Sequence, residues 1–145
     1  MRLTLKAVFN HASNGAPIGD LDATTDCPGG GTAHVVGTTS STAAQGGTTI
    51  DVTYDLAACL YGETSLTATK TFAVSSTGKI TEQGMLGVQP GATTTLTFAG
   101  TGLTLTGTVY DPPLSYSTQM CSLSATQTGN AVSGVLCGRP AAFGF

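Results

Sequence analysis

The sequence has little charge of either sign. Asp, Glu, Lys and Arg together make up 9% of the 145 residues, whereas about 25% is typical of a soluble domain. The net charge is −3, and the five basic residues are scattered along the chain. Nucleic-acid binding depends on neutralising phosphates with clustered Lys and Arg side chains. We therefore expect no nucleic-acid partner.

Tryptophan and long apolar runs are also missing. No run approaches the roughly 20 apolar residues that a membrane-spanning helix needs, so we expect no transmembrane segment. The first nine residues alternate between apolar and polar side chains and do not form the continuous apolar core of a signal peptide. We expect that a signal peptide has been removed or that Met1 is an expression start.

Threonine and glycine are abundant instead. The chain has 27 Thr and 20 Gly residues. Threonine is β-branched and favours strands, and glycine supplies turns. Apolar residues make up 40% of the chain, which is too many for a disordered segment. The composition therefore predicts an all-β domain with many turns.

Alternation of apolar and polar residues indicates where the strands lie. It is clearest over 50–56 and recurs over 3–9, 66–74, 96–98 and 103–109, with weaker signals at 33–38, 80–88, 116–125, 131–137 and 142–145. Gly- and Pro-containing turn signals separate these segments, for example at 77–78, at Gly100 and at 112–113. The pattern predicts one domain over 1–145, an antiparallel β-sandwich or barrel of about nine to ten strands in mostly meander order. The longest segment outside the predicted strands is 10–31.

The spacing of the four cysteines predicts two disulfides. None form a C-x-x-C pair, which argues against a zinc ribbon or a thioredoxin-like site. A hairpin centred on Gly129 pairs Ala125 with Ser133, Leu123 with Val135 and Cys121 with Cys137. Directly opposite cysteines favour a cross-strand disulfide.

By elimination, Cys27 pairs with Cys59. A hairpin that turns within 41–47 and brings Val36 near Ile50 would place both cysteines toward its open end, with Gly29–Gly31 forming a bulge or irregular entry. Two disulfides indicate an oxidising location, which means a secreted, periplasmic or outer-surface protein.

A family resemblance points the same way. Cys27-Pro-Gly-Gly-Gly-Thr32, the alternating strand that follows, Asp55 and Cys59, and then Thr- and Gly-rich strands resemble β-rich, secreted or lipoprotein-type domains of Gram-negative bacteria. The resemblance covers about residues 27–137. These domains are largely uncharacterised, so the resemblance implies an envelope location and no chemistry.

Three of the eight acidic residues, Asp20, Asp22 and Asp26, lie within seven residues of one another in the segment 10–31. Calcium takes six to eight oxygen ligands, often several from one loop. The spacing is not that of an EF-hand, and carboxylates in a loop also serve as turn caps. A calcium site at these residues is therefore one interpretation, and a solvated loop is the other.

The two histidines are the candidates for catalysis. His11 lies in the same segment as the acids, and His34 lies on a predicted strand, in register with Val36 and so on the apolar face. If both met the acidic segment, a His and carboxylate site could bind zinc and activate water for ester or lactone hydrolysis. A histidine on a strand more often makes a structural hydrogen bond, so no catalytic residue is assigned.

Two tyrosines and the strand edges are candidate contact surfaces. Tyr110 and Tyr116 flank the loop that contains Pro112 and Pro113, where they either contact a ligand or support the turn. Thr-rich strands with few Lys residues favour edge-to-edge pairing, and the terminal segment 141–145 could join its own sheet or that of a neighbour.

Taken together, these features favour a non-catalytic, secreted or cell-envelope domain with a structural or interaction role. Calcium stabilises this domain if the three aspartates form a metal site. Two alternatives remain open. One is a small metal-dependent hydrolase of esters or lactones, and the other is a self-assembling surface or filament subunit.

Overall fold

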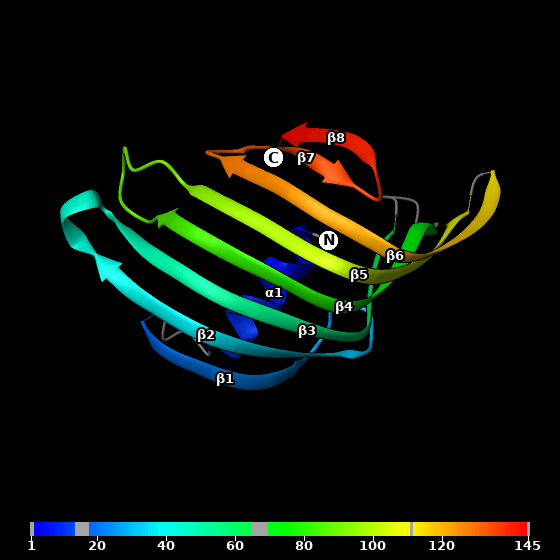
Figure 1. The fold of residues 1–145 in the computed structure, drawn as a ribbon, viewed down its shortest axis with the longest axis horizontal. Coiled ribbons are helices and arrows are strands. Elements are labelled where there is room, and N and C mark those ends of the chain that lie inside the picture. Colours follow the sequence, from blue (N-terminus) through cyan, green and yellow to red (C-terminus); the bar gives the residue numbers. More distant parts are fainter. Residues whose placement is uncertain (1, 14–17, 65–69, 111, 145) are drawn as a thin grey trace.

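The computed structural model describes residues 2–13, 18–64, 70–110 and 112–144. Its elements are α1 (Arg2–Ala12), β1 (Gly19–Asp26), β2 (Thr32–Thr42), the short 3-10 helix η1 (Ala43–Gln45), β3 (Gly47–Thr64), β4 (Lys70–Gly87), β5 (Thr95–Tyr110), β6 (Pro113–Thr128), β7 (Ala131–Leu136) and β8 (Arg139–Gly144). The described strands form one antiparallel sheet in the order β1 to β8 (Figure 1). The predicted all-β meander is confirmed, with eight strands in a single sheet.

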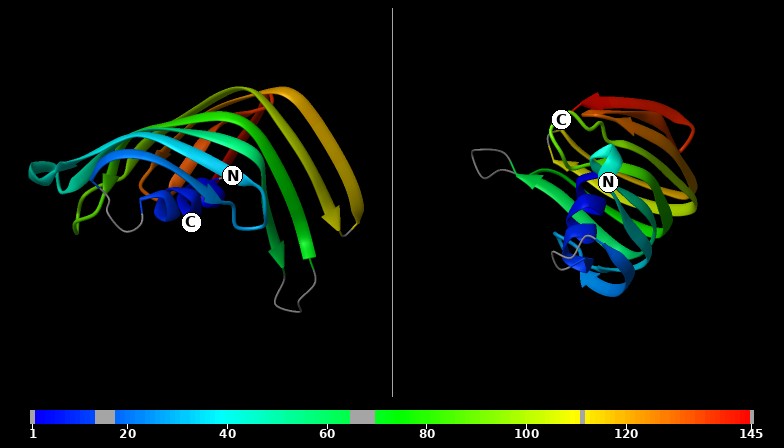
Figure 2. Two further views of the ribbon diagram at one scale, coloured as in Figure 1. Left: turned by 90° about the horizontal axis from the view of Figure 1, so that it is seen from below. Right: turned by 90° about the vertical axis from the view of Figure 1, so that its left-hand side faces the viewer.

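The sheet is strongly curved, and α1 lies against its concave face (Figure 2). The core is the layer between the helix and this face. Its buried apolar side chains are Leu5, Val8 and Phe9 of α1, together with Ala33, Val35, Ile50, Val52, Tyr54, Leu56, Ile80, Leu96, Phe98, Leu103, Leu105 and Val132 of the sheet. The convex face is polar; one cross-strand row of exposed side chains consists of Thr38, Asp51, Gln83, Thr97, Thr126 and Ser133.

The strand predicted over 3–9 is wrong, because this segment belongs to α1. Leu5, Val8 and Phe9 recur at helical spacing and are buried on one side of the helix. Ser13 ends the helix: its backbone N–H donates to the Phe9 carbonyl at 2.9 Å, and its hydroxyl donates to the Asn10 carbonyl at 3.2 Å. A segment whose sequence alternates like that of a strand therefore forms the helix that packs against the concave face.

The predicted long loop 10–31 is also wrong over much of its length. Its middle forms β1, the edge strand that pairs with β2. Leu21 is the one buried side chain of β1. A strand with a single buried apolar residue shows almost no alternation in sequence, so the pattern of 19–26 indicates a loop instead.

A line of β-bulges crosses the four longest strands and bends them. Register shifts occur between Leu56 and Cys59, between Thr77 and Lys79, and between Gly100 and Leu105. The positive-φ residues at these places, and in the adjoining part of β6, are Ala58, Gly78, Gly102 and Met120. Bulges bend and twist a strand without ending it. The turns predicted at 77–78 and at Gly100 are therefore bulges inside β4 and β5, which accounts for the smaller number of strands.

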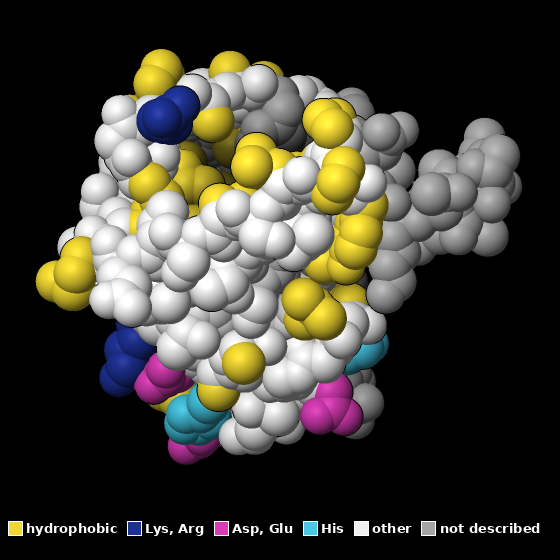
Figure 3. Space-filling view, turned by 90° about the vertical axis from the view of Figure 1, so that its right-hand side faces the viewer, with side chains coloured by type: hydrophobic (Ala, Val, Ile, Leu, Met, Phe, Trp, Pro, Cys, Tyr) yellow, Lys and Arg dark blue, Asp and Glu magenta, His cyan; other side chains and the backbone are white. Residues whose placement is uncertain are grey.

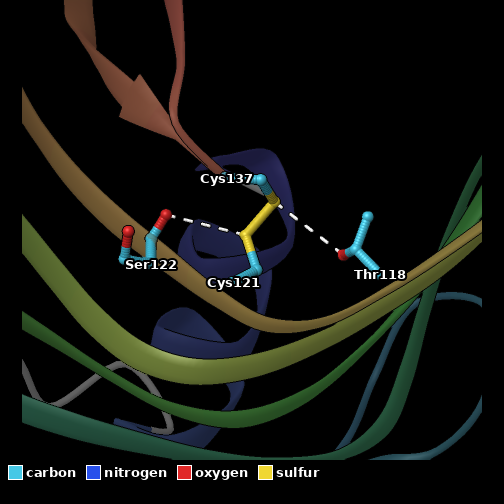
Figure 4. The surroundings of a disulfide bond; sticks show 4 residues. All are labelled: Thr118, Cys121, Ser122 and Cys137. Carbon is cyan, nitrogen blue, oxygen red and sulfur yellow. Dashed lines mark hydrogen bonds between the residues drawn. A yellow bond between two sulfur atoms is a disulfide. The ribbon is translucent and has the colours of Figure 1, made fainter.

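Both predicted disulfides are present, and both adjoin this line of bulges. Cys121 and Cys137 have Cα atoms 4.6 Å apart. In Figure 4 the Thr118 hydroxyl lies 3.8 Å from Cys137 Sγ, and the Ser122 carbonyl oxygen lies 3.6 Å from Cys121 Sγ. The predicted hairpin register is wrong by one residue, because Gly129 and Asn130 form a two-residue turn that pairs Thr128 with Ala131. Cys137 follows the end of β7 with a φ of 50°, and this places it beside Cys121.

The Cys27–Cys59 disulfide, with a Cα–Cα distance of 5.4 Å, fastens the β1–β2 turn to β3. Two backbone hydrogen bonds reinforce it, from Gly29 N to Leu60 O at 2.9 Å and from Leu60 N to Gly30 O at 2.8 Å. The predicted proximity of Val36 and Ile50 is wrong: Val36 pairs with Thr53, and Ile50 pairs with Thr39. The turn at 43–46 does lie within the predicted 41–47, so the difference is a shift of three residues in the register of β2 against β3.

Candidate ligand-binding site

The three aspartates of the acidic segment lie on β1. Asp20, Asp22 and Asp26 are exposed, and their even spacing places them on one face of the strand. At about 3.3 Å per residue, the outer two are about 20 Å apart along the strand. In the ranges that the structure describes, no three His, Cys, Asp or Glu side chains gather to hold a metal ion. The structure therefore gives the calcium interpretation no support.

The histidines lie on opposite sides of the sheet. His11 is exposed in the last turn of α1, on the concave side. His34 lies on the convex face, because Ala33 and Val35 are the residues of β2 that point into the core. The prediction that His34 lies on the apolar face is wrong. The sheet separates the two histidines, and the structure does not bring them together.

His34 does meet one of the acids. Its Nε2 lies 2.7 Å from Asp22 Oδ1 across the β1–β2 pairing, and both side chains are largely exposed. On its other side, His34 is the cross-strand partner of Asp55, whose carboxylate lies 3.4 Å from Lys79 Nζ. Exposed pairs of this kind contribute little to stability. The arrangement is a short polar row on the convex face, and its residues do not line either of the two pockets found among the described residues.

Tyr116 lines a shallow hollow in the bent part of the sheet. Its ring lies so close to Gly107 that a Cβ atom there would be 2.4 Å from the ring. The hollow measures about 290 Å³ and is also lined by Leu60, Ala73, Ser75, Thr106, Thr108 and Ser115. Tyr110 is not among the residues that line it; it ends β5 and pairs with Pro113. Of the two predicted contact residues, Tyr116 therefore borders this hollow and Tyr110 does not.

A second pocket, about 90 Å³ in volume, lies between α1 and the end of the sheet formed by β5 to β8. It is lined by Leu5, Phe98, Leu123, Ala125, Val132, Gly134, Val135, Leu136 and Ala141, and Ser133 is the one lining residue with a polar side chain. Figure 3 shows hydrophobic side chains gathered in a hollow in the upper part of that view. Sequence reasoning missed this pocket because its walls combine α1, at the start of the chain, with the strands β5 to β8 near its end.

Arg139 stands beside this pocket. It precedes the lining residue Ala141 by two positions on β8, so the two side chains lie on the same face of the strand. Its cross-strand partner is Leu136, another lining residue. Arg139 is exposed, and it forms no ion pair with any carboxylate in the described part of the chain. The pocket therefore combines an apolar lining with a neighbouring positive charge that has no carboxylate partner among the described residues.

No helix in the described residues is long and apolar enough to cross a membrane. Comparison of the chain with protein family models, curated proteins and solved structures finds no match.

Proposed function

We propose that the chain is a non-catalytic domain of a secreted or cell-envelope protein, which binds another molecule without transforming it. The observation that carries the proposal is the apolar pocket beside α1. Nine of its ten lining residues have no polar side chain, and the tenth, Ser133, carries its hydroxyl on the convex face of the sheet. Catalytic pockets generally contain a nucleophile, a general acid or base, or a metal with an open position. An apolar pocket is suited to binding.

The two disulfides support the proposed location. Cys27–Cys59 and Cys121–Cys137 account for all four cysteines. Structural disulfides persist in oxidising compartments and are rare in the cytosol. Their places next to the line of bulges indicate a structural role, since they cross-link the sheet where its long strands bend.

The hydrolase is the weaker candidate. The pair formed by His34 and Asp22 is the observation in its favour. A catalytic zinc site uses three protein ligands around one metal, and the described residues offer no such group. Self-association is the other candidate, because β1 and β8 are edges of the described sheet. The three aspartates of β1 work against pairing at that edge, as charged side chains do on edge strands generally.

Hydrolysis of short-chain p-nitrophenyl esters tests the proposal. The protein is stripped with EDTA and assayed alone, with zinc and with calcium, and thermal unfolding is followed in the same samples. We expect no turnover above buffer and no change in midpoint, because a ligand that binds only the folded state must raise its stability. Zinc-dependent turnover that disappears in His34→Ala would overturn the proposal in favour of the hydrolase. Light scattering that reveals large species would favour the self-assembling subunit.

A further inference from the structure

We propose that the pocket between α1 and β5–β8 binds the alkyl end of a small amphiphile whose anionic head group is held by Arg139. This inference rests on the proposed binding function and names the class of ligand. An alkyl carboxylate is the simplest molecule with this chemistry.

The size and lining of the pocket set the apolar part of the ligand. At about 90 Å³ it is smaller than the engineered cavity of about 150 Å³ that binds benzene. It therefore accepts a thin alkyl end and not a ring system. Leu5, Leu123, Val132 and Leu136 enclose that end with apolar groups from the helix and the sheet. Burial of methylene groups against such a surface is favourable, and the alkyl end brings no polar group into the pocket that would need a hydrogen-bond partner.

Arg139 sets the charge of the head group. Along a strand, residues two apart lie about 6.6 Å from each other, so the guanidinium lies within reach of a head group whose chain passes Ala141. Arg139 has no carboxylate partner among the described residues. Guanidinium groups bind carboxylates through paired, charge-assisted hydrogen bonds. The acidic strand β1 lies at the opposite edge of the sheet, so it supplies no competing attraction for a cation at this end.

Three probes with the same alkyl chain separate the two contributions: decanoate, decanol and decyltrimethylammonium. Isothermal titration calorimetry of the disulfide-intact protein, below the concentration at which each probe forms micelles, gives the affinities. We expect saturable one-to-one binding of decanoate, weaker binding of decanol, and binding of the cation that is weaker still.

Variants at Arg139 test the head-group contact. Arg139→Gln is expected to weaken decanoate binding about tenfold, the loss that corresponds to one charged hydrogen bond, and to leave decanol binding unchanged. Arg139→Lys restores part of the affinity because it keeps the charge and loses the paired geometry. Lys6→Gln, which removes an exposed charge from α1, serves as the control and is expected to change neither affinity.

A matched pair of variants tests the pocket itself. Ala141 and Ala142 are neighbours on β8 and point to opposite faces, and only Ala141 lines the pocket. Ala141→Leu fills part of the pocket and is expected to weaken binding of decanoate and decanol at least about tenfold. Ala142→Leu adds the same side chain to the other face and is expected to leave both affinities unchanged. Far-UV circular dichroism checks that both variants fold.

Equal effects of the two alanine variants, equal affinities for the anion and the cation, or no saturable binding of decanoate would each overturn the inference. Such a result leaves the proposed non-catalytic function standing, because that function is refuted by metal-dependent turnover and not by the loss of this ligand.

Discussion

Removal of each disulfide should lower the free energy of unfolding by a predictable amount. The Cys121–Cys137 bond closes a sequence separation of 16 residues, and the Cys27–Cys59 bond closes one of 32. In the chain-entropy model the shorter loop corresponds to about 3 kcal/mol. The longer loop corresponds to about 0.6 kcal/mol more than the shorter one, because doubling the loop length raises the entropic cost of closure by that amount. Loss of both bonds therefore removes about 7 kcal/mol, a large part of the about 5–15 kcal/mol that stabilises a typical domain.

Urea unfolding measures these losses. Tyrosine fluorescence or far-UV circular dichroism reports the transition, because the chain has no Trp. Three samples are compared with the oxidised protein: the paired Cys→Ala variant of each disulfide and the wild type reduced with a thiol. Cys59 and Cys121 are buried, so alanine also leaves a small cavity, whereas reduction keeps the sulfur atoms in place. The reduced protein thus isolates the contribution of the cross-links.

Two results would show that the disulfides contribute little: a loss of less than about 1 kcal/mol in either paired variant, or unfolding of the reduced protein at the same urea concentration as the oxidised one. Either result would mean that packing between α1 and the sheet is sufficient to hold the bent strands in place.

Three further predictions concern the core and the β1–β2 turn. Tyr54→Phe removes the 2.6 Å hydrogen bond that the buried hydroxyl donates to Glu82, and we expect urea unfolding to show a loss of about 1–3 kcal/mol. Gly31→Ala places a Cβ atom 2.1 Å from the Ala58 carbonyl oxygen at a φ of 76°; we expect a loss of more than about 1 kcal/mol and a lower thermal midpoint. Leu5→Ala empties a position that is 1% exposed beneath the sheet, and a loss of about 2–5 kcal/mol in the same urea assay is expected.

The disulfides and most strands were predictable because their signals are local. Alternation over 50–56 marks the middle of β3, where Ile50, Val52, Tyr54 and Leu56 are buried as expected. The pairing of Cys121 with Cys137 survives an error of one residue in the hairpin register. Cys137 lies in the two-residue turn between β7 and β8 with a φ of 50°, and this position brings it beside Cys121 despite the different register.

The helix and the edge strand were not predictable from pattern alone. Leu5 and Phe9 fit both a strand and a helix, and only Val8 distinguishes the two spacings. Glycine is typical of turns, but Gly78 and Gly102 each lie in a bulge within a continuous strand. Whether a glycine ends a strand or bends it depends on its cross-strand neighbours, which the local sequence does not contain.

The candidate site was outside the reach of sequence reasoning for a similar reason. Leu5 and Ala141 lie near opposite ends of the chain, and the curved sheet brings both to one pocket. Neither Leu5 nor Ala141 has a side chain that indicates a binding site by itself. The acids and histidines have side chains typical of functional sites, but in the described residues they lie on exposed surfaces and do not gather at one place.

Methyl NMR during a decanoate titration locates the bound alkyl chain and so tests whether the pocket between α1 and β5–β8 is a binding site. We expect the shifted methyl signals to be those of Leu5, Leu123, Val132 and Leu136, while the signals of Val36 on the convex face stay unchanged. Shifts centred on Val36, or no shifts at decanoate concentrations up to the onset of micelles, would contradict it.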